Sequence, residues 1–253
     1  MTRYPDHEST DYGIDAPGLV RNFALAGISA FAVGIFFYYS FAEARPAQAA
    51  LVAGFGVVWG ACGLGAAALM VFSSKRGKLE ERDRTLDSIP WRGDERVLDA
   101  GCGRGLMLIG AAKRLTSGVA VGVDTWREKD QSGNSPEAAL TNARAEGVEE
   151  RVEILEGDLR ELPFEDESFD VILSSLVLHN INEREERAAA VRGLTRILKP
   201  GGHIVILDIW DTGEYAKSLR EAGMRYVSRS KLRFSIFPPA RLVTARKPGS
   251  GEV

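Results

Sequence analysis

The sequence predicts an α/β domain built on a mainly parallel sheet and preceded by a transmembrane helical hairpin. The α/β domain is indicated by short apolar runs that alternate with helical segments from residue 95 onward, and by a glycine-rich turn after the first run. The hairpin is indicated by two long uncharged runs. The chain then divides into a polar lead (1–22), two transmembrane helices (23–74), a linker helix (75–94) and the α/β domain (95–253).

Composition narrows the function classes. The chain has 253 residues and a formal net charge of −3, and no stretch interleaves Lys or Arg with aromatic residues, so we expect no nucleic-acid partner. Two cysteines, Cys62 and Cys102, are too few for a disulfide framework, which fits a reducing compartment. The three histidines show no metal-ligand spacing, so we expect no metal site.

The hairpin prediction depends on length. Phe23 to Phe41 form an uncharged run long enough for a helix to cross about 30 Å of hydrocarbon, and a second run extends from Ala47 to Ser74. A buried helix pair in a soluble protein is the alternative interpretation. Small residues recur every four positions in both runs, which predicts close helix packing and allows a homodimer through the hairpin. These small residues are Ala26, Ala30, Gly34, Gly56 and Gly60.

Basic residues predict the orientation of the hairpin. The connection between the two runs contains only Arg45, whereas the exit of the second run is rich in Lys and Arg, so we expect both termini and the α/β domain in the cytoplasm. The segment from Lys75 to Ser88 is predicted to continue as a short helix that ends before Pro90. The domain is therefore expected close to the lipid surface. The basic residues of the exit are Lys75, Arg76, Lys78, Arg82 and Arg84.

The stretch V-L-D-A-G-C-G-R-G, from Val97 to Gly105, organises the α/β domain. An apolar strand ends at Asp99 and is followed by a turn in which three glycines allow a close approach to bare backbone. A helix is predicted directly after the turn, from Leu106 to Leu115, so free N–H groups should point out of the junction.

The spacing D-x-G-x-G-x-G in this turn resembles motif I of the class I S-adenosylmethionine-dependent methyltransferases. Later segments fit the same family in the same order: two strands that end in acids, Val119–Asp124 and Val152–Asp158, a fourth strand Phe169–Ser175, and the turn L-K-P-G-G before the strand His203–Trp210. The resemblance implies a Rossmann-like seven-stranded methyltransferase sheet in the order 3-2-1-4-5-7-6. It also implies S-adenosyl-L-methionine as the cofactor.

The resemblance also implies the cofactor site. Asp124 would accept hydrogen bonds from the ribose hydroxyls, and Asp158 would contact the adenine amino group. The full set of expected cofactor-binding residues is Asp99, Gly101, Cys102, Gly103, Gly105, Asp124, Thr125, Asp158, Leu159 and Ser174.

Two residues are candidates for catalysis. His179 follows the fourth strand, in a region that faces the transferred methyl group in the resembling family, and an imidazole with a reference pKa of about 6.5 could accept a proton at neutral pH. Asp130, in the polar loop after the second strand, is the other candidate. The alternative for His179 is a residue that only shapes the pocket. Asp208 is a second-rank candidate, whereas His203 is expected to be structural.

The remaining elements have local boundary signals. Ser135, Pro136 and Gly147 mark the start and end of a helix. Asn182 is the expected cap of a helix that runs to Leu198. Trp126 is open to two interpretations: it packs near the adenine or the acceptor, or it packs under its own loop. The segments 226–234 and 241–245 are predicted as a closing antiparallel pair.

Three functions are compatible with these observations. The favoured one is a membrane-anchored methyltransferase that acts on a small lipophilic acceptor, such as a quinone-like ring, a lipid or a hydrophobic thiol, associated with the bilayer. A dinucleotide-dependent oxidoreductase is the second, although the third glycine comes one residue earlier than in the usual dinucleotide motif. The third is a non-catalytic S-adenosylmethionine-binding membrane module. The pattern does not identify the methylated atom or a required base.

Overall fold

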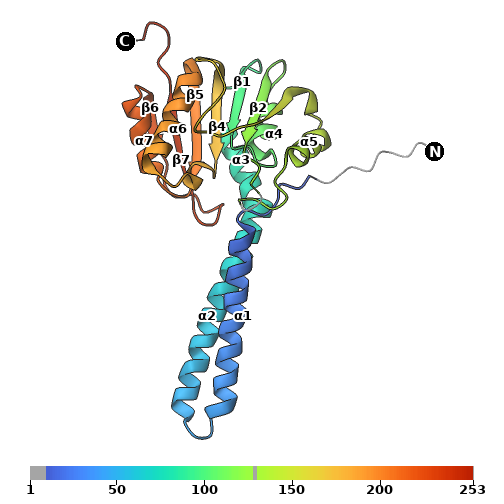
Figure 1. Cartoon of the computed structure of the whole chain (residues 1–253), viewed down its shortest axis with the longest axis vertical. Coiled ribbons are helices and arrows are strands. Elements are labelled where there is room, and N and C mark those ends of the chain that lie inside the picture. The colour runs from blue at the N-terminus through green and yellow to red at the C-terminus, as the bar shows by residue number, and fades with distance from the viewer. Residues whose placement is uncertain (1–9, 128–129, 253) are drawn as a thin grey trace, which may run out of the picture.

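The computed structural model describes residues 10–127 and 130–252 as one seven-stranded sheet with flanking helices and a long helical hairpin (Figure 1). The first nine residues of the predicted lead lie outside the described residues. The strands are β1 (Arg96–Ala100), β2 (Val119–Asp124), β3 (Val152–Glu156), β4 (Phe169–Ser175), β5 (Leu198–Asp208), β6 (Arg225–Arg229) and β7 (Arg241–Arg246). The helices of the domain are α3 (Lys78–Leu86), α4 (Leu106–Ala112), α5 (Pro136–Ala145), α6 (Arg184–Ile197) and α7 (Thr212–Glu221), with 3₁₀ turns η2 (Glu149–Arg151) and η3 (Leu178–Asn180).

The sheet has the order β3-β2-β1-β4-β5-β7-β6, which confirms the predicted fold. Strands β1 to β5 are parallel, and β7 runs antiparallel to both of its neighbours, β5 and β6. The chain leaves β1 toward β2 on one side, and β4 lies on the other side. In such sheets a ligand crevice forms at the carboxyl ends of the strands where the direction of winding changes, here between β1 and β4.

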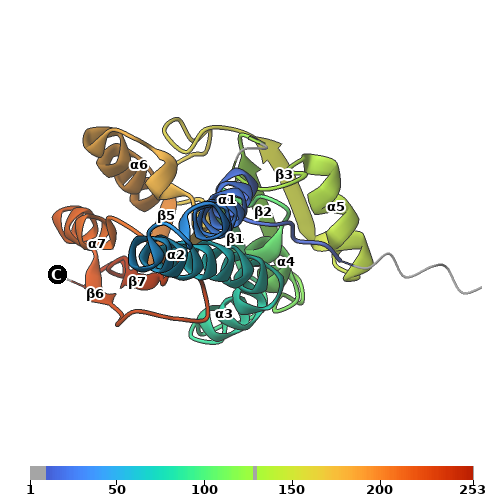
Figure 2. The ribbon, with the colours of Figure 1, turned by 90° about the horizontal axis from the view of Figure 1, so that it is seen from below.

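Apolar side chains alternate along the strands and form one core on each face. Val97 is buried against α3, α4 and α5, whereas its neighbour Leu98 is buried against α6 and α7. Both are fully excluded from solvent, because β1 is central in a sheet that is covered on both sides. Figure 2 shows α3 and α4 on one face and α6 on the other.

The hairpin consists of α1 (Pro17–Phe41) and α2 (Pro46–Phe72), which project away from the domain (Figure 1). Glycines form the contact between them: a Cβ at Gly34 would meet Gly56, and one at Gly27 would meet the backbone of Gly60. Ala26 is exposed, and Gly27 takes the contact predicted for it. A glycine row allows close backbone approach, so the seam follows the residues without side chains.

Helix α2 leads without interruption into the segment that was predicted as a linker helix, residues 75–94. A π-helical turn, η1 (Ser73–Gly77), leads directly into α3. Backbone approach fixes this turn to the domain, because a Cβ at Gly77 would overlap the carbonyl oxygen of Ser235 in the loop between β6 and β7. In the same place Phe237 N donates to Ser73 Oγ at 2.9 Å. The hairpin therefore meets the domain through a packed junction.

The observed starts of α5 and α6 show which of the predicted capping residues are correct. Ser135 caps α5, since its Oγ accepts from Ala138 N at 3.1 Å, as predicted. The predicted cap of α6 was wrong: the helix begins after Glu183, not after Asn182, and no side chain in the described part of the chain caps it. Acidic residues in the first turn, Glu185 and Glu186, stabilise that end through the helix dipole instead.

Candidate cofactor and acceptor site

The loop after β1 has the backbone geometry that its glycines allow. Gly101, Gly103 and Gly105 all have positive φ, at 84°, 52° and 86°. A Cβ at Gly101 would collide with Val177, and one at Gly103 would collide with Gln131. Only glycine fits these two positions, so the loop presents bare backbone to the space beside it. Gly105 is the N-cap of α4 and packs near Ile109, outside the cavity lining.

Asp124, at the carboxyl end of β2, organises two loops. Its Oδ2 accepts from Gly103 N at 2.8 Å and its Oδ1 accepts from Trp126 N at 2.7 Å. Each carboxylate oxygen keeps a lone pair for a further donor. The side chain therefore fixes the glycine loop and can still accept hydroxyl groups from a ligand.

Asp99 is buried at the carboxyl end of β1, and neither carboxylate oxygen has a partner in hydrogen-bond geometry among the described residues. Burial raises the pKa of Asp99 to about 7, the charge of Asp124 adds to the increase, and the nearby Leu108 amide only partly offsets it. An unpartnered buried carboxylate fits a ligand that carries positive charge or donors. The site therefore has the chemistry expected for a sulfonium and ammonium cofactor.

A cavity of about 650 Å³ opens at this edge of the sheet. On the sheet side it is lined by Asp99, Gly101, Asp124 and Asp158. On the hairpin side it is lined by apolar residues from distant parts of the chain and by the charged Asp15, Lys78 and Arg82. The volume lies within the range of ligand pockets. The apolar lining includes Leu19 of α1, Met70 of α2, and Ile236, Phe237 and Pro238 of the β6–β7 loop.

The other predicted cofactor residues fall into two groups. Cys102, Thr125, Asp158 and Leu159 line the cavity. Ser174 does not, because it is buried within β4, and its Oγ has no partner among the described residues. Burial raises the pKa of the Cys102 thiol, so this cysteine is a packing residue of the loop and a poor nucleophile.

Asp158 has an ionic partner of its own. Arg160 Nη2 lies 2.6 Å from Asp158 Oδ2 and also pairs with Glu186, and the hydrogen bond from Arg160 holds the pKa of Asp158 below its usual value. This carboxylate stays ionised in the physiological range. Arg160 and Glu186 also line the cavity.

His179 lines the cavity and is oriented by Asp208. The imidazole Nδ1 lies 2.6 Å from Asp208 Oδ1, and Asp208 also accepts from the His179 backbone amide at 3.2 Å, from Ile209 N at 2.7 Å and from the Tyr215 hydroxyl at 3.3 Å. Asp208 is fully buried, and an acceptor-only carboxylate places the imidazole proton on Nδ1. Nε2 is then the basic nitrogen. The Trp210 ring packs edge-on against the imidazole, with the two ring centroids 5.8 Å apart.

Asp130 also lines the cavity, and its backbone carbonyl accepts from Ala16 N at 3.0 Å. His203 lies at the other end of the sheet, where β5 pairs with the final residue of β7, Arg246. Among the described residues, no group of three or more His, Cys, Asp or Glu side chains is placed to hold a metal ion.

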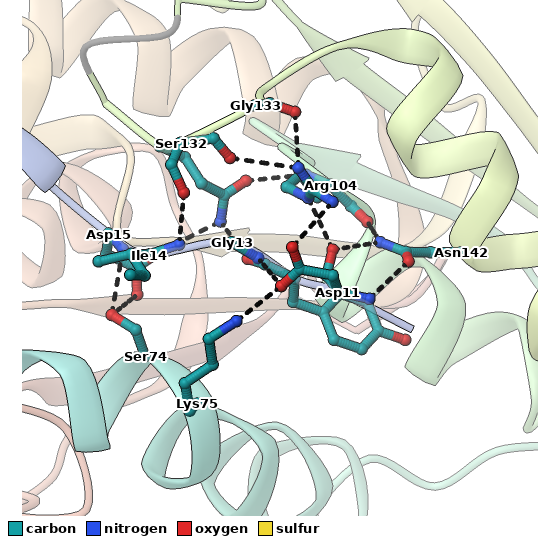
Figure 3. Close-up of polar contacts among 12 residues, drawn as sticks. Asp11, Gly13, Ile14, Asp15, Ser74, Lys75, Arg104, Ser132, Gly133 and Asn142 are labelled. Carbon is teal, nitrogen blue, oxygen red and sulfur yellow. Dashed lines mark hydrogen bonds and ion pairs between the residues drawn. The ribbon is translucent and has the colours of Figure 1, made fainter. Parts of the chain in front are cut away.

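An N-terminal strap, residues 11–16, lies across the glycine loop and was not predicted from the sequence (Figure 3). Asp11 bridges Lys75 at the top of the hairpin and Arg104 in the glycine loop, at 2.9 and 3.3 Å. Asn142 of α5 exchanges two hydrogen bonds with the backbone of Asp11. Asp15 N donates to Ser74 Oγ at 3.1 Å.

Two further residues fix the strap from beneath. Gln131 accepts from Arg104 N at 3.0 Å and donates to Tyr12 O at 3.0 Å, so its amide joins the glycine loop to the strap. The buried Lys78 ammonium donates to the carbonyls of Tyr12 and Gly13 and to Asp15. Burial lowers the pKa of Lys78, and the Asp15 carboxylate opposes that decrease. No local pattern marks Gln131 or Lys78, because their partners lie far away in the sequence.

The sheet order, the glycine loop after β1 and the acid that ends β2 define the class I methyltransferase fold. Comparison with known proteins agrees: residues 98–206 match the family described as methyltransferase domain. Together the fold and this match support S-adenosylmethionine as the cofactor.

Individual relatives resemble part of the chain. A demethylmenaquinone methyltransferase of Staphylococcus aureus is 31% identical over 128 residues, which cover 50% of this chain and 48% of that protein. The chain thus spans about half the length of the curated relatives it matches.

Solved structures share the fold at low identity. A methyltransferase from Aquifex aeolicus, described as SAM dependent, is 21% identical with a TM-score of 0.53 and covers 67% of this chain and 90% of its own. The [4+2]-cyclase SpnF is 20% identical with a TM-score of 0.57, over 68% of this chain and 82% of its own. At this identity the likeness shows the fold alone, and the two proteins are described by different chemistries.

Proposed function

We propose that the protein is a membrane-anchored methyltransferase that moves a methyl group from S-adenosylmethionine to a small lipophilic acceptor. The observation that carries the proposal is the two-sided cavity. Its sheet side has bare backbone and three carboxylates, and its hairpin side has a cluster of apolar residues beside the charged Asp15, Lys78 and Arg82. A polar cofactor and an apolar acceptor can therefore lie in one enclosed space.

The cofactor would be held by the chain in three places. The backbone of the glycine loop and the carboxylate of Asp99 would face its charged part, Asp124 the ribose hydroxyls, and Asp158 the adenine. When bound, the cofactor supplies a methyl group that is already activated on a sulfonium. The protein has then to align the acceptor and exclude water, and both tasks suit a cavity closed by the strap and the hairpin.

His179 is suited to remove a proton from the acceptor. With Nδ1 held by Asp208, Nε2 can accept the proton of a hydroxyl, and the buried carboxylate stabilises the imidazolium that forms. A phenol-like or enol-like hydroxyl would gain most, whereas a thiol needs less assistance. The name of the Staphylococcus aureus relative fits an acceptor of the quinone class.

The hairpin supports a membrane location. The most apolar 18-residue windows of its two helices have mean hydropathies of 1.7 and 1.9, and only 11% and 22% of those windows are buried within the protein, unlike the core helices of a soluble domain. Exposed apolar side chains such as Phe36, Phe55 and Trp59 surround the pair. We propose an integral membrane protein with both termini and the catalytic domain in the cytoplasm, as the basic residues after α2 suggest. The homodimer stays a prediction.

The test is calorimetric titration of S-adenosylhomocysteine into the detergent-solubilised protein. We expect micromolar affinity that is lost in Asp124→Ala. Glu156→Ala is the matched control, because Glu156 pairs with Asp124 across the β2–β3 register and is exposed. Thermal unfolding of both variants separates loss of the site from loss of the fold.

The outcomes discriminate among the functions. Absence of binding in a folded wild-type protein would contradict the cofactor assignment, and titration with NADH would then test the oxidoreductase alternative. Binding without methylation of any screened quinol, phenol or thiol would favour the non-catalytic module. The fold shared with a [4+2]-cyclase makes product analysis by mass spectrometry necessary, since a cyclisation leaves the acceptor mass unchanged.

A further inference from the structure

The loop between β6 and β7, residues 230–240, lies on the hairpin side of the domain (Figure 1). Three contacts hold it there: Phe237 N donates to Ser73 Oγ, and Ser235 and Arg233 both bind Glu81, a fully buried residue of α3. Ser73 directly follows Phe72, the final residue of α2. The loop is therefore fixed at the level where α2 leaves its apolar stretch.

This loop exposes large apolar side chains at that level. Phe234 is 76% exposed and Leu232 is 43% exposed, although the adjacent Ile236 is buried in the domain core. Phe72 itself is 60% exposed. Exposed basic residues lie nearby in the chain, at Lys231 in the loop and at Arg76 in η1. Aromatic and aliphatic groups beside cationic ones are typical of surfaces that lie in the headgroup region of a bilayer.

The mouth of the cavity is on the hairpin side of the domain, as is the β6–β7 loop. Trp210 and Leu19 line the cavity and are nevertheless 61% and 43% exposed, so they stand at its opening. Phe237 and Pro238 of the loop line it as well. Exposed polar residues such as Arg160 and Glu183 line the cavity too. The apolar part of the opening, beside the end of two membrane helices, is therefore the part that would face lipid.

We propose that the β6–β7 loop is a second membrane contact, which inserts Phe234 and Leu232 into the lipid interface and holds the mouth of the cavity there. This inference rests on the proposed membrane anchor. It restricts the acceptor to amphipathic molecules that reside at the interface, with the reactive group near the headgroups and an apolar tail in the bilayer. Such an acceptor passes from lipid to His179 without crossing water.

The structure offers a matched control for this contact. Tyr226 is 76% exposed, the same fraction as Phe234, and lies near the start of β6. In the strand register, Arg225 at this end lies opposite Arg246 of β7. At the other end of β7, Arg241 lies opposite Asp208, the carboxyl end of β5. Tyr226 and Phe234 are thus equally exposed at opposite ends of one strand pair.

The experiment places an environment-sensitive fluorophore on single cysteines in the full-length protein. Phe234→Cys, Tyr226→Cys and Val57→Cys are made in a Cys62→Ala background, since Cys62 is exposed and Cys102 is buried. The proteins are reconstituted in phosphatidylcholine liposomes with a minor share of phosphatidylglycerol. Lipids spin-labelled near the headgroup then quench any label that reaches the interface.

We expect the label at residue 234 to shift its emission to the blue and to be quenched more than about twofold relative to the label at residue 226. Equal, weak quenching at residues 234 and 226, with strong burial of the label at Val57 in the middle of α2, would overturn the inference and leave the anchor intact. A label at residue 57 that reports water would contradict the anchor itself. Binding of S-adenosylhomocysteine by each variant shows that the domain is folded.

Discussion

At the residue scale, Asp99 is the most informative group, because its carboxylate is buried without a partner. Its pKa is raised to about 7, so between pH 4 and 7 the folded state holds a proton that the unfolded state has released. The protonated Asp99 therefore contributes to the free energy of unfolding at low pH, and this contribution is lost as pH rises through about 7. Asp99→Asn should therefore gain stability relative to wild type between pH 5 and pH 8.

The gain in the free energy of unfolding is at most about 1.4 kcal/mol for each unit by which the pKa of Asp99 is higher in the folded than in the unfolded chain. It is measured by thermal unfolding of the ligand-free protein at the two pH values. Glu156→Gln, an exposed carboxyl in β3, is the control and should show no such divergence. A constant difference between Asp99→Asn and wild type at all pH values would show that Asp99 is ionised in the folded state throughout.

The pair of His179 and Asp208 gives a second prediction at this scale. Nitrogen-15 histidine spectra should show His179 protonated on Nδ1 in wild type, and Asp208→Asn should abolish that preference, since an amide can donate as well as accept. The chain has only three histidines, so His179→Gln assigns the signal.

Kinetic measurements on His179→Gln show whether His179 is a general base or only a packing residue. With a long-chain alkylphenol as acceptor, loss of a general base should lower kcat by about 100-fold or more with little change in the affinity for S-adenosylhomocysteine. His203→Gln is the control, because His203 lies in the middle of β5 and does not line the cavity. An unchanged kcat in His179→Gln would show that alignment alone is sufficient.

At the scale of elements, the N-terminal strap depends on one buried cation. Lys78 is 4% exposed and satisfies three acceptors of the strap, whereas Lys75 is 53% exposed and pairs with Asp11 alone among the described residues. Lys78→Met should destabilise the domain by about 1 to 3 kcal/mol, because it removes a buried donor from Asp15 and two carbonyls, although Gln131 Nε2 still donates to Asp15 and to Tyr12 O. Lys75→Met should cost at most about 1 kcal/mol.

Unfolding midpoints of the two variants measure this difference. Lys78→Met should also weaken binding of S-adenosylhomocysteine, because the strap holds Gln131 and Arg104 beside the glycine loop. Equal midpoints for both variants would show that the strap contributes little to the stability of the domain.

The junction of hairpin and domain is the other feature at this scale. A Cβ at Gly77 would overlap the Ser235 carbonyl, whereas one at Gly65 of α2 would meet nothing. Gly77→Ala should therefore loosen the β6–β7 loop and increase its proteolysis, while Gly65→Ala should have no effect or slightly stabilise the helix. Protection of the loop in both variants would mean that η1 can shift to accommodate the methyl group.

At the scale of the whole molecule, the orientation of the hairpin can be tested directly. The connection between α1 and α2, residues 42–45, lies at the end of the hairpin farthest from the domain (Figure 1). In intact cells Glu43→Cys should react with a membrane-impermeant maleimide, and Asp166→Cys, exposed in the catalytic domain, should react only after lysis. The opposite pattern would place the domain outside the cytoplasm and away from the cellular supply of cofactor.

Much of the architecture was determined by the sequence alone. The glycine loop and the two apolar helices follow from local patterns, since each has its own periodicity and its own turn residues. The strand order and the roles expected for Asp124 and His179 came from the resemblance of these motifs to a known family, and the parallel strands bring both residues to one edge of the sheet.

The tertiary structure decided what links these parts. Tyr12 meets Gln131 across 119 positions, and His179 meets Asp208 across 29, so no local window contains both partners. The hairpin seam uses Gly27 in place of Ala26, because the helices cross at an angle that only their packing fixes. The cavity arises in the same way: its wall combines the hairpin, the sheet edge and the β6–β7 loop, and long-range contacts alone bring them together.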